Sequence, residues 1–376
     1  MKPALKYFNI TIASLLLISC QNLKSNQEKD LITSLDSLVI SEINEKKIPS
    51  IAIGIVKDGS PVVAKAFGLA DVEANIKADA NTVYQLGSVT KMFTGHVLAS
   101  LIDEGKISIS DTLATYFPDS LNFPVSPTGQ IVTIKEIATH SSEFPRYPFN
   151  LEREDPHPIK GYTYEQMLEG ISNVEIDTLI GTRYSYSNFG FGVLGAAMEN
   201  HTGQSLPALM DSRIFSKYEM KNSSLVFKEE FAKKLATPYL ETQPPLKTEP
   251  WEMGKLAAAG NVFSTVNDLN KLMIGMLNNS EINTIQQKQY FSINETWSYG
   301  LGCFIVYSEK QNTQLIYHGG DIDGYASSLT LYPEYGLGVV ILTNWGEGQS
   351  IGDAFDGIYS IVNDHFLGKN PDETKN

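Results

Sequence analysis

The stretch that decides the fold is IAIGIVKDGSPVVAKAF, residues 51–67. Two β-rich runs, Ile51 to Lys57 and Pro61 to Phe67, flank Asp58-Gly59, and this pattern is typical of a β-hairpin. Strand-like runs return only towards the other end of the chain: Tyr299 to Tyr307, Leu315 to His318, Tyr325 to Tyr332 and Gly338 to Asn344. We therefore expect a single antiparallel sheet built from both ends of the chain.

Helical patterns surround and separate these strands. Leu31, Leu35 and Leu38 recur at helical spacing ahead of Pro49, and another helical pattern follows the last strand, over residues 351–366. Between about residues 92 and 295 the pattern is mainly helical and is broken by loops. The expected class is α+β: an antiparallel sheet formed by N- and C-terminal strands and flanked by helices, with a large, mainly helical region inserted between them.

The first residues have the pattern of an export signal. Lys2 and Lys6 precede a short apolar run that ends in Leu17-Ile18-Ser19-Cys20. This ending resembles the lipobox of bacterial lipoproteins, which implies that Cys20 is lipidated and anchors the protein in the periplasm or at the cell surface. The alternative is an ordinary signal peptide that contains a cysteine. The predicted organisation is a signal peptide with its lipobox cysteine over residues 1–20, a tether over 21–30, one domain over 31–368 and a tail over 369–376.

Composition narrows the possible partners and cofactors. The chain has 29 Lys and Arg against 43 Asp and Glu, and a formal net charge of −14 argues against nucleic acid because its phosphates would be repelled. The six histidines show no metal-ligand spacing, so we expect neither a metal nor another cofactor. Cys303 lies in an apolar run, and we expect it to be a buried structural thiol.

The first pattern with catalytic potential is Ser88-Val89-Thr90-Lys91. Residues i and i+3 share a helix face, so the hydroxyl of Ser88 and the amine of Lys91 point to the same place. Such a lysine can take the serine proton, and a helix N-terminus favours the developing negative charge. The alternative is a helix start with a capping serine and a solvated lysine. The apolar residues that follow predict a buried helix face: Met92, Phe93, Val97, Leu98 and Leu101.

A second pattern is Tyr186-Ser187-Asn188. A phenol near a lysine can transfer a proton as phenol or phenolate, and the amide of Asn188 can hold a substrate carbonyl. The alternative is a polar turn before the next helix. Ser120-Leu121-Asn122 is a rival for the same role.

A third pattern, His318-Gly319-Gly320, ends one strand-like run. Two glycines allow a substrate backbone to lie against the strand edge. The backbone N–H of Asp321 and that of Ser88 are then candidates for an oxyanion hole. The alternative is a glycine-rich hairpin turn with an incidental histidine.

These three patterns, in this order, resemble the three motifs of the serine β-lactamase and penicillin-binding-protein superfamily: Ser-x-x-Lys, Tyr-x-Asn and Lys/His-Thr/Gly-Gly. The Tyr-x-Asn form is similar to the class C β-lactamase branch, which also contains D,D-carboxypeptidases, D-aminopeptidases and esterases. Two further stretches resemble that branch, TIKEIATHSS over residues 133–142 and AGNVFST over residues 259–265. The resemblance runs from about Ile48 to Asn344.

The resemblance implies a fold, an activity and residue roles. It implies the β-lactamase/transpeptidase-like fold and an exported serine hydrolase that cleaves peptide, amide or ester bonds through an acyl-enzyme on Ser88. Lys91 would activate Ser88, and Tyr186 would relay protons. Asn188 would hold the substrate amide, and residues 318–320 would line the opposite wall.

Two positions depart from the family pattern. His318 replaces the lysine of true β-lactamases, and since a histidine is only partly charged at neutral pH, a peptidase or esterase is favoured over a β-lactamase. Glu143 stands where the family loop usually has glycine, so we expect that loop to be altered near the site entrance.

The open alternatives are a class C-like β-lactamase and a slow-acylating, penicillin-binding sensor or scaffold. The expected partner is a small-molecule or peptide substrate, including a cell-wall peptide or a β-lactam, with the membrane reached only through the lipid anchor.

Overall fold

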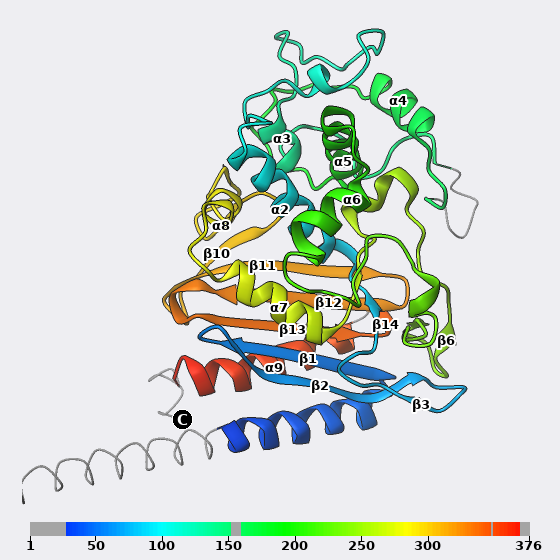
Figure 1. Cartoon of the computed structure of the whole chain (residues 1–376), viewed down its shortest axis with the longest axis vertical. Helices are drawn as coiled ribbons and strands as arrows, with labels where there is room; N and C mark the ends of the chain where they lie inside the picture. Colours follow the sequence, from blue (N-terminus) through cyan, green and yellow to red (C-terminus); the bar gives the residue numbers. More distant parts are fainter. Residues whose placement is uncertain (1–27, 152–158, 347–348, 369–376) are drawn as a thin grey trace, which may run out of the picture.

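The computed structural model describes residues 28–151, 159–346 and 349–368 (Figure 1). The predicted signal peptide with Cys20, the predicted tether up to residue 27 and the predicted tail from residue 369 lie outside these ranges. Residues 28–30, expected in the tether, already belong to a helix over 28–46. Within the described ranges no helix combines the length and the apolar composition that a membrane crossing needs.

The main sheet is antiparallel and has nine strands in the order β3-β2-β1-β13-β12-β11-β10-β9-β8. In that order the strands are Ile76–Lys77, Ser60–Asp71, Ser50–Lys57, Leu337–Thr343, Tyr325–Tyr332, Thr313–Ile322, Phe304–Ser308, Trp297–Tyr299 and Phe291–Ser292. Strand β1 pairs with β2 in the hairpin and with β13 from the other end of the chain, where Ile53 lies opposite Ile341. The predicted sheet from both ends of the chain is confirmed.

The remaining elements lie mostly between the two groups of strands. The helices are α2 (Thr90–Asp103), α3 (Ile134–Ala138), α4 (Tyr164–Ser172), α5 (Asn188–Thr202), α6 (Leu206–Met210), α7 (Val266–Met276), α8 (Glu281–Gln286) and α9 (Gln349–Phe366). Two small sheets pair β4 (Tyr84–Gln85) with β7 (Phe263–Ser264), and β5 (Tyr239–Leu240) with β6 (Leu246–Lys247) and β14 (Trp345–Gly346). Figure 1 shows the helix over 28–46 and α9 on one face of the main sheet and α2, α7 and α8 on the other.

Strand β1 separates two apolar cores. Successive strand residues point to opposite faces of a sheet. Ile53 and Ile55 therefore pack with the helix over 28–46 and with α9, while Ala52 and Val56 belong to the larger core under the inserted helices. Because both faces are covered, residues 51–56 of the strand are apolar or glycine and do not alternate with polar residues.

The strand predicted over Tyr299 to Tyr307 is interrupted. β9 ends at Tyr299, β10 begins at Phe304, and a bend lies between them. Gly302 has a φ of 71°, and a Cβ there would lie 2.0 Å from the carbonyl oxygen of Lys91, so the bend makes room for α2. Cys303 is buried in this bend, and burial raises the pKa of its thiol to about 12, so the predicted structural thiol is confirmed.

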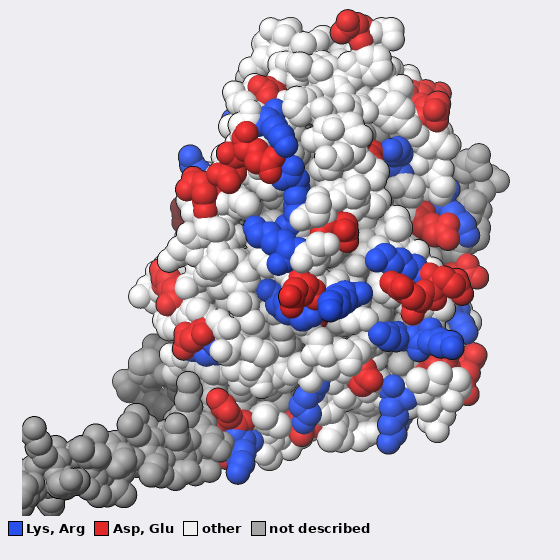
Figure 2. Space-filling view, viewed as in Figure 1, with Lys and Arg blue, Asp and Glu red and all other residues white. Residues whose placement is uncertain are grey.

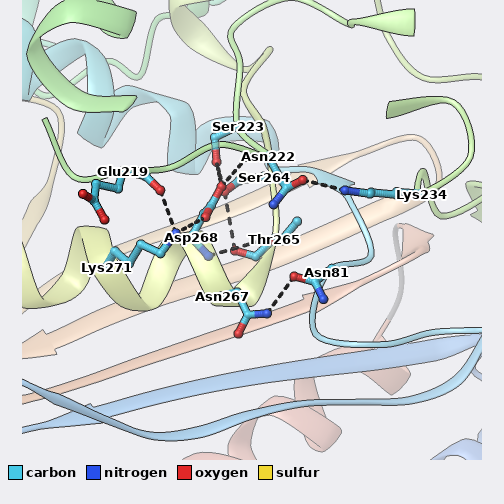
Figure 3. Close-up of polar contacts among 10 residues, drawn as sticks. All are labelled: Asn81, Glu219, Asn222, Ser223, Lys234, Ser264, Thr265, Asn267, Asp268 and Lys271. Carbon is cyan, nitrogen blue, oxygen red and sulfur yellow. Dashed lines mark hydrogen bonds and ion pairs between the residues drawn. The ribbon is translucent and has the colours of Figure 1, made fainter. Parts of the chain in front are cut away.

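A buried carboxylate, that of Asp268, ties α7 to the loop that contains Asn222 and Ser223. The side chain of Thr265 caps α7 by accepting a hydrogen bond from the N–H of Asp268 at 3.2 Å. The Asp268 carboxylate accepts hydrogen bonds from the backbone N–H of Asn222 at 2.7 Å and from the hydroxyl of Ser223 at 3.1 Å (Figure 3). The Nζ of Lys271 also donates to this carboxylate, at 2.8 Å from Oδ1 of Asp268. One side chain thus satisfies donors from two segments that are far apart in the sequence.

We expect Asp268→Ala to lower the free energy of unfolding by about 3 kcal/mol, because buried donors then lose their acceptor. The measurement is urea unfolding followed by circular dichroism. The matched control is Asn267→Ala on the same helix, which removes only an exposed hydrogen bond to Asn81 (Figure 3). A cost for Asp268→Ala no larger than that of the control would contradict this assignment.

Ion pairs on the surface contribute little to holding these layers together. Figure 2 shows acidic and basic side chains interspersed over the middle and lower parts of one face. Ion pairs such as Lys65 with Asp36 and Lys106 with Glu104 are partly exposed, and such pairs add about 0–1 kcal/mol each. Stability therefore comes mainly from the two apolar cores.

Candidate active site

Ser88 and Lys91 lie at the start of the central helix. Ser88 is in a 3₁₀ turn over Gly87–Val89 that runs directly into α2. Residues Thr90 to Leu101 of α2 are all buried. The predicted buried face is confirmed, and the burial extends to the other faces of this part of the helix. Because the helix passes through the larger core, it carries the Lys91 side chain into the interior, where it is fully buried.

The Lys91 amine contacts three oxygen atoms. Its Nζ lies 3.1 Å from Oγ of Ser88, 2.8 Å from Oδ1 of Asn188 and 2.7 Å from the carbonyl oxygen of Ala259. No carboxylate of the described residues is among these contacts. Burial, and secondarily the charge of Arg146, lowers the pKa of Lys91 well below its ordinary value.

A neutral lysine amine can satisfy all three of these contacts. It donates its two hydrogens to Asn188 Oδ1 and to the Ala259 carbonyl, so its lone pair is left for the hydroxyl hydrogen of Ser88. The alternative of a solvated lysine at a helix start is wrong, since the side chain is buried. The geometry suits proton transfer from Ser88 to Lys91.

The N-terminus of α5 carries the second pattern. Ser187 is the N-cap: its Oγ accepts a hydrogen bond from Gly190 N–H at 2.7 Å and donates one to the Pro145 carbonyl at 2.6 Å. Tyr186 therefore immediately precedes the helix and Asn188 begins it. The rival Ser120-Leu121-Asn122 lies elsewhere: Ser120 is exposed and does not line the cavity described below.

Tyr186 has two basic side chains close to its ring. Lys91 Nζ is 4.7 Å and the Arg146 guanidinium carbon 5.3 Å from the centre of its ring. Burial raises the pKa of the Tyr186 phenol, and the neighbouring Ser88 hydroxyl and the charge of Arg146 offset this only in part. At neutral pH the side chain is therefore a phenol, which can donate a proton, rather than a phenolate.

His140 packs against the ring of Tyr186 and was not predicted as a site residue. The two ring centres are 4.3 Å apart, and His140 Nδ1 accepts a hydrogen bond from the backbone N–H of Ser187 at 3.0 Å. His140 is fully buried and has a φ of 58°. The sequence marked His140 only as part of the stretch over residues 133–142. Its contact with Tyr186 joins residues that are distant in the chain, so no local pattern indicated it.

Strand β11 forms the opposite wall with the third pattern. A Cβ added at Gly320 would lie 2.0 Å from the carbonyl oxygen of Leu86 and 3.0 Å from the backbone nitrogen of Ser88. The backbone nitrogen of Asp321 comes within 3.0 Å of the Cβ position at Gly87. Glycine at both positions thus lets β11 approach the turn that carries Ser88, so the backbone nitrogens of Ser88 and Asp321 lie close to each other. This arrangement fits the predicted oxyanion hole, and the incidental hairpin turn is wrong because residues 318–320 lie within β11.

His318 is neutral, so the expectation that it is partly charged is wrong. It is only 2% exposed, and both ring nitrogens are occupied. Nδ1 lies 2.6 Å from the carbonyl oxygen of Gly319, to which it donates, and Nε2 lies 3.2 Å from the hydroxyl of Tyr299. Burial, and secondarily Lys91, lowers the pKa of His318 to about 3. Strand β11 therefore offers a substrate no positive charge at this position.

Glu143 adopts the backbone conformation that glycine favours, with a φ of 65°. Its carboxylate is almost buried and forms an ion pair with the exposed guanidinium of Arg183. The loop therefore keeps the backbone conformation that a glycine would adopt. What differs is the side chain, which adds an ion pair to Arg183, just before Tyr184.

A cavity of about 450 Å³ opens above Ser88. Its lining residues come from the 3₁₀ turn before α2, the loops before α4 and α5, the strands β10, β11 and β12, and α9: Ser88, Arg146, Tyr186, Phe304, Tyr317, His318, Gly319, Gly320, Asp321, Ala326, Ser327, Ile351, Gly352 and Phe355. The three predicted motifs thus meet at one cavity. In the part of the chain that the structure describes, no group of three or more His, Cys, Asp or Glu side chains is placed to hold a metal ion.

The buried histidines predict a loss of stability in acid. Burial lowers the pKa of His96 to about 4, that of His318 to about 3 and that of His140 well below its ordinary value. Below pH 6.5, the ordinary value, the unfolded chain binds protons that the folded chain does not, so each of these histidines lowers the free energy of unfolding by up to about 1.4 kcal/mol per pH unit. Above pH 6.5 these groups add no pH dependence.

His96→Gln tests this contribution away from the cavity. His96 contacts Gln286 at 2.9 Å and Tyr218 at 3.3 Å. We measure the free energy of unfolding with urea between pH 7 and 5. It is expected to fall less steeply with decreasing pH in the variant than in the wild type, by the equivalent of about one bound proton. An unchanged slope would mean that His96 is protonated in the folded protein.

The fold and the cavity define a protein of the β-lactamase/transpeptidase type. A family model described as Beta-lactamase matches residues 35–359, and the chain belongs to this family. Family membership and the paired hydroxyl and amine together support a serine hydrolase.

Two proteins and one solved structure illustrate what the chain is similar to. Protein flp of Staphylococcus aureus (strain MW2) is 25% identical over 324 residues, which cover 82% of this chain and 62% of that protein. The chain thus spans less than two thirds of that relative. The D-alanyl-D-alanine-carboxypeptidase/endopeptidase AmpH of Escherichia coli (strain K12) is 23% identical, with 82% of this chain and 83% of that protein covered. The structure of the octameric penicillin-binding protein homologue from Pyrococcus abyssi superposes with a TM-score of 0.78 at 25% identity, covering 91% of this chain and 78% of that one.

Proposed function

We propose that the protein is an exported serine hydrolase that cleaves peptide, amide or ester bonds through an acyl-enzyme on Ser88. The observation that carries the proposal is the buried Lys91 amine 3.1 Å from Ser88 Oγ, with its other two contacts made to acceptors. Among the activities of the family, we favour a D,D-carboxypeptidase, D-aminopeptidase or esterase over a β-lactamase. The neutral His318 on β11 supports this preference, because it gives no charge to a β-lactam carboxylate.

The acylation step follows from the contacts at Ser88. Lys91 takes the hydroxyl proton while Oγ attacks the substrate carbonyl, and the backbone N–H groups of Ser88 and Asp321 stabilise the resulting oxyanion. The bond to the leaving group then breaks. Tyr186 donates its proton to the leaving atom and regains one from Lys91, and Asn188 orients the substrate amide.

Hydrolysis of the acyl-enzyme reverses these transfers with water as the nucleophile. Tyr186 and Lys91 together take the water proton, the bond from the carbonyl to Ser88 Oγ breaks, and Oγ receives a proton. The product is a carboxylic acid, and Ser88 is restored. Because Lys91 and Tyr186 exchange one proton, their titration belongs to the pair.

The test is intact-protein mass spectrometry of a soluble form lacking residues 1–20. Wild type and Ser88→Ala are followed over time with a penicillin, a cephalosporin and an activated ester. An adduct on the wild type alone supports Ser88 as the nucleophile. Its lifetime separates rapid β-lactam turnover from a persistent adduct of a peptidase or sensor. A folded wild type that is acylated by none of the three reagents overturns the proposal in favour of a scaffold.

We also propose that Cys20 is lipidated and anchors the protein outside the cytoplasm, from the lipobox-like sequence alone. Labelling of the full chain with radioactive palmitate and fractionation of the cells would test this. We expect label in the membrane fraction for the wild type and none for Cys20→Ala. Unlabelled wild-type protein would mean an ordinary signal peptide.

A further inference from the structure

The cavity has a positive side chain on only one of its walls. Among its described lining residues, Arg146 is the sole lysine or arginine. On the opposite wall His318 is buried with both ring nitrogens occupied. The lysine beneath, Lys91, is engaged by Ser88, Asn188 and Ala259. A negative group on a substrate therefore has one cationic partner among these lining residues, and it comes from the loop between α3 and α4.

Arg146 is held at the cavity by its backbone and by aromatic rings. Its carbonyl oxygen accepts hydrogen bonds from the N–H groups of Asn188 at 3.0 Å and Phe189 at 3.1 Å, which fix the residue to the N-terminus of α5. Its guanidinium carbon lies 5.3 Å from the centre of the Tyr186 ring and 6.0 Å from that of Tyr147. The guanidinium is thus presented beside the phenol that we assign to proton transfer.

The guanidinium has no carboxylate partner among the described residues, and the side chain is exposed. The two other described arginines both form ion pairs, Arg183 with Glu143 and Arg213 with Glu104. An exposed, oriented guanidinium next to a nucleophile is suited to binding a carboxylate through two parallel hydrogen bonds.

We propose that Arg146 binds a carboxylate of the substrate and thereby selects anionic acyl compounds. This inference rests on the proposed function, because it names the substrate class of the same cavity.

Two matched pairs of esters test the proposal. In one pair the leaving group carries either a carboxylate or the corresponding carboxamide, and in the other pair the acyl group does. For at least one pair, we expect Arg146→Gln to lower kcat/KM of the carboxylate ester by about 10–100-fold and that of the carboxamide by less than about threefold. Arg146→Lys restores part of the loss because it keeps the charge without the bidentate geometry. The charge-matched control is Lys77→Gln, on exposed β3 at the far edge of the sheet, with no change expected.

Equal losses for carboxylate and carboxamide esters in both pairs would overturn the proposal and make Arg146 a support for Tyr186. No loss for either ester would overturn it as well. Equilibrium binding of the same esters to Ser88→Ala by calorimetry separates this proposal from the proposed function, since binding needs no acylation. A preference for the carboxylate ester that disappears in Ser88→Ala/Arg146→Gln supports the subsite even if the wild type forms no adduct. An adduct on wild-type Ser88 without any such preference leaves the proposed function intact and overturns the subsite.

Discussion

Replacing Lys91 by methionine is expected to lower kcat/KM for a simple ester by about 10²–10⁴-fold while the protein stays folded. The amine lies 3.1 Å from Ser88 Oγ, and in its neutral form it is a far stronger base than the Tyr186 phenol, which also contacts the Ser88 hydroxyl. Methionine fills a similar volume but has no basic atom. Steady-state ester hydrolysis, with thermal unfolding as the check on folding, measures the effect.

Lys91→Arg distinguishes a base from a mere positive charge. An arginine stays protonated in proteins, so it cannot take the Ser88 proton, and we expect it to be as inactive as the methionine variant. Lys65→Met is the matched control, since that lysine pairs with Asp36 on the far side of the molecule and should leave turnover unchanged. Activity of Lys91→Arg close to that of the wild type would show that Lys91 acts only through its charge.

Tyr186→Phe is expected to have the second largest effect, and the effect should depend on the leaving group. For an amide or an alkyl ester, whose leaving atom needs a proton, we expect kcat/KM to fall by about 10²–10⁴-fold. For an ester of an acidic phenol the loss should be much smaller, because that group departs as an anion. The comparison of the two substrates is the measurement.

Tyr184→Phe provides the control two residues earlier. The hydroxyl of Tyr184 is buried and has no hydrogen-bond partner among the described residues, so its removal should cost neither activity nor stability. Equal losses for both leaving groups in Tyr186→Phe would argue against proton donation. That result would point to a role in shaping the cavity together with His140, whose ring centre lies 4.3 Å from that of Tyr186.

Much of the fold was predictable because its signals are local. The hairpin around Asp58-Gly59 and the strand runs near the C-terminus each depend on a few neighbouring residues, and the structure pairs β1 with β2 and with β13. The interruption between Tyr299 and Phe304 was not predictable, since Gly302 bends the chain to accommodate the backbone of Lys91. That contact exists only once α2 lies against the sheet.

The predicted catalytic and binding residues were found by spacing and by motif order. The structure places Ser88, Tyr186 and residues 318–321 on one cavity, and Lys91 connects Ser88 to Asn188 through hydrogen-bond contacts. Their charge states were not predictable. His318 was expected to be partly charged and is neutral, because it is buried beside Tyr299. Arg146 and His140 lie in a loop and a turn whose local sequence has no catalytic pattern.

By itself the sequence determined the class of fold, the order of the three motifs and the shared helix face of Ser88 and Lys91. These properties follow from the period of a helix or strand and from spacings of a few residues. The tertiary structure alone decided that Lys91 is desolvated between Asn188 and Ala259, that β11 carries no charge at His318, and that Arg146 faces the cavity. The physical reason is that burial and electrostatic interaction depend on neighbours in space, and the chain supplies these neighbours from distant positions only when it is folded.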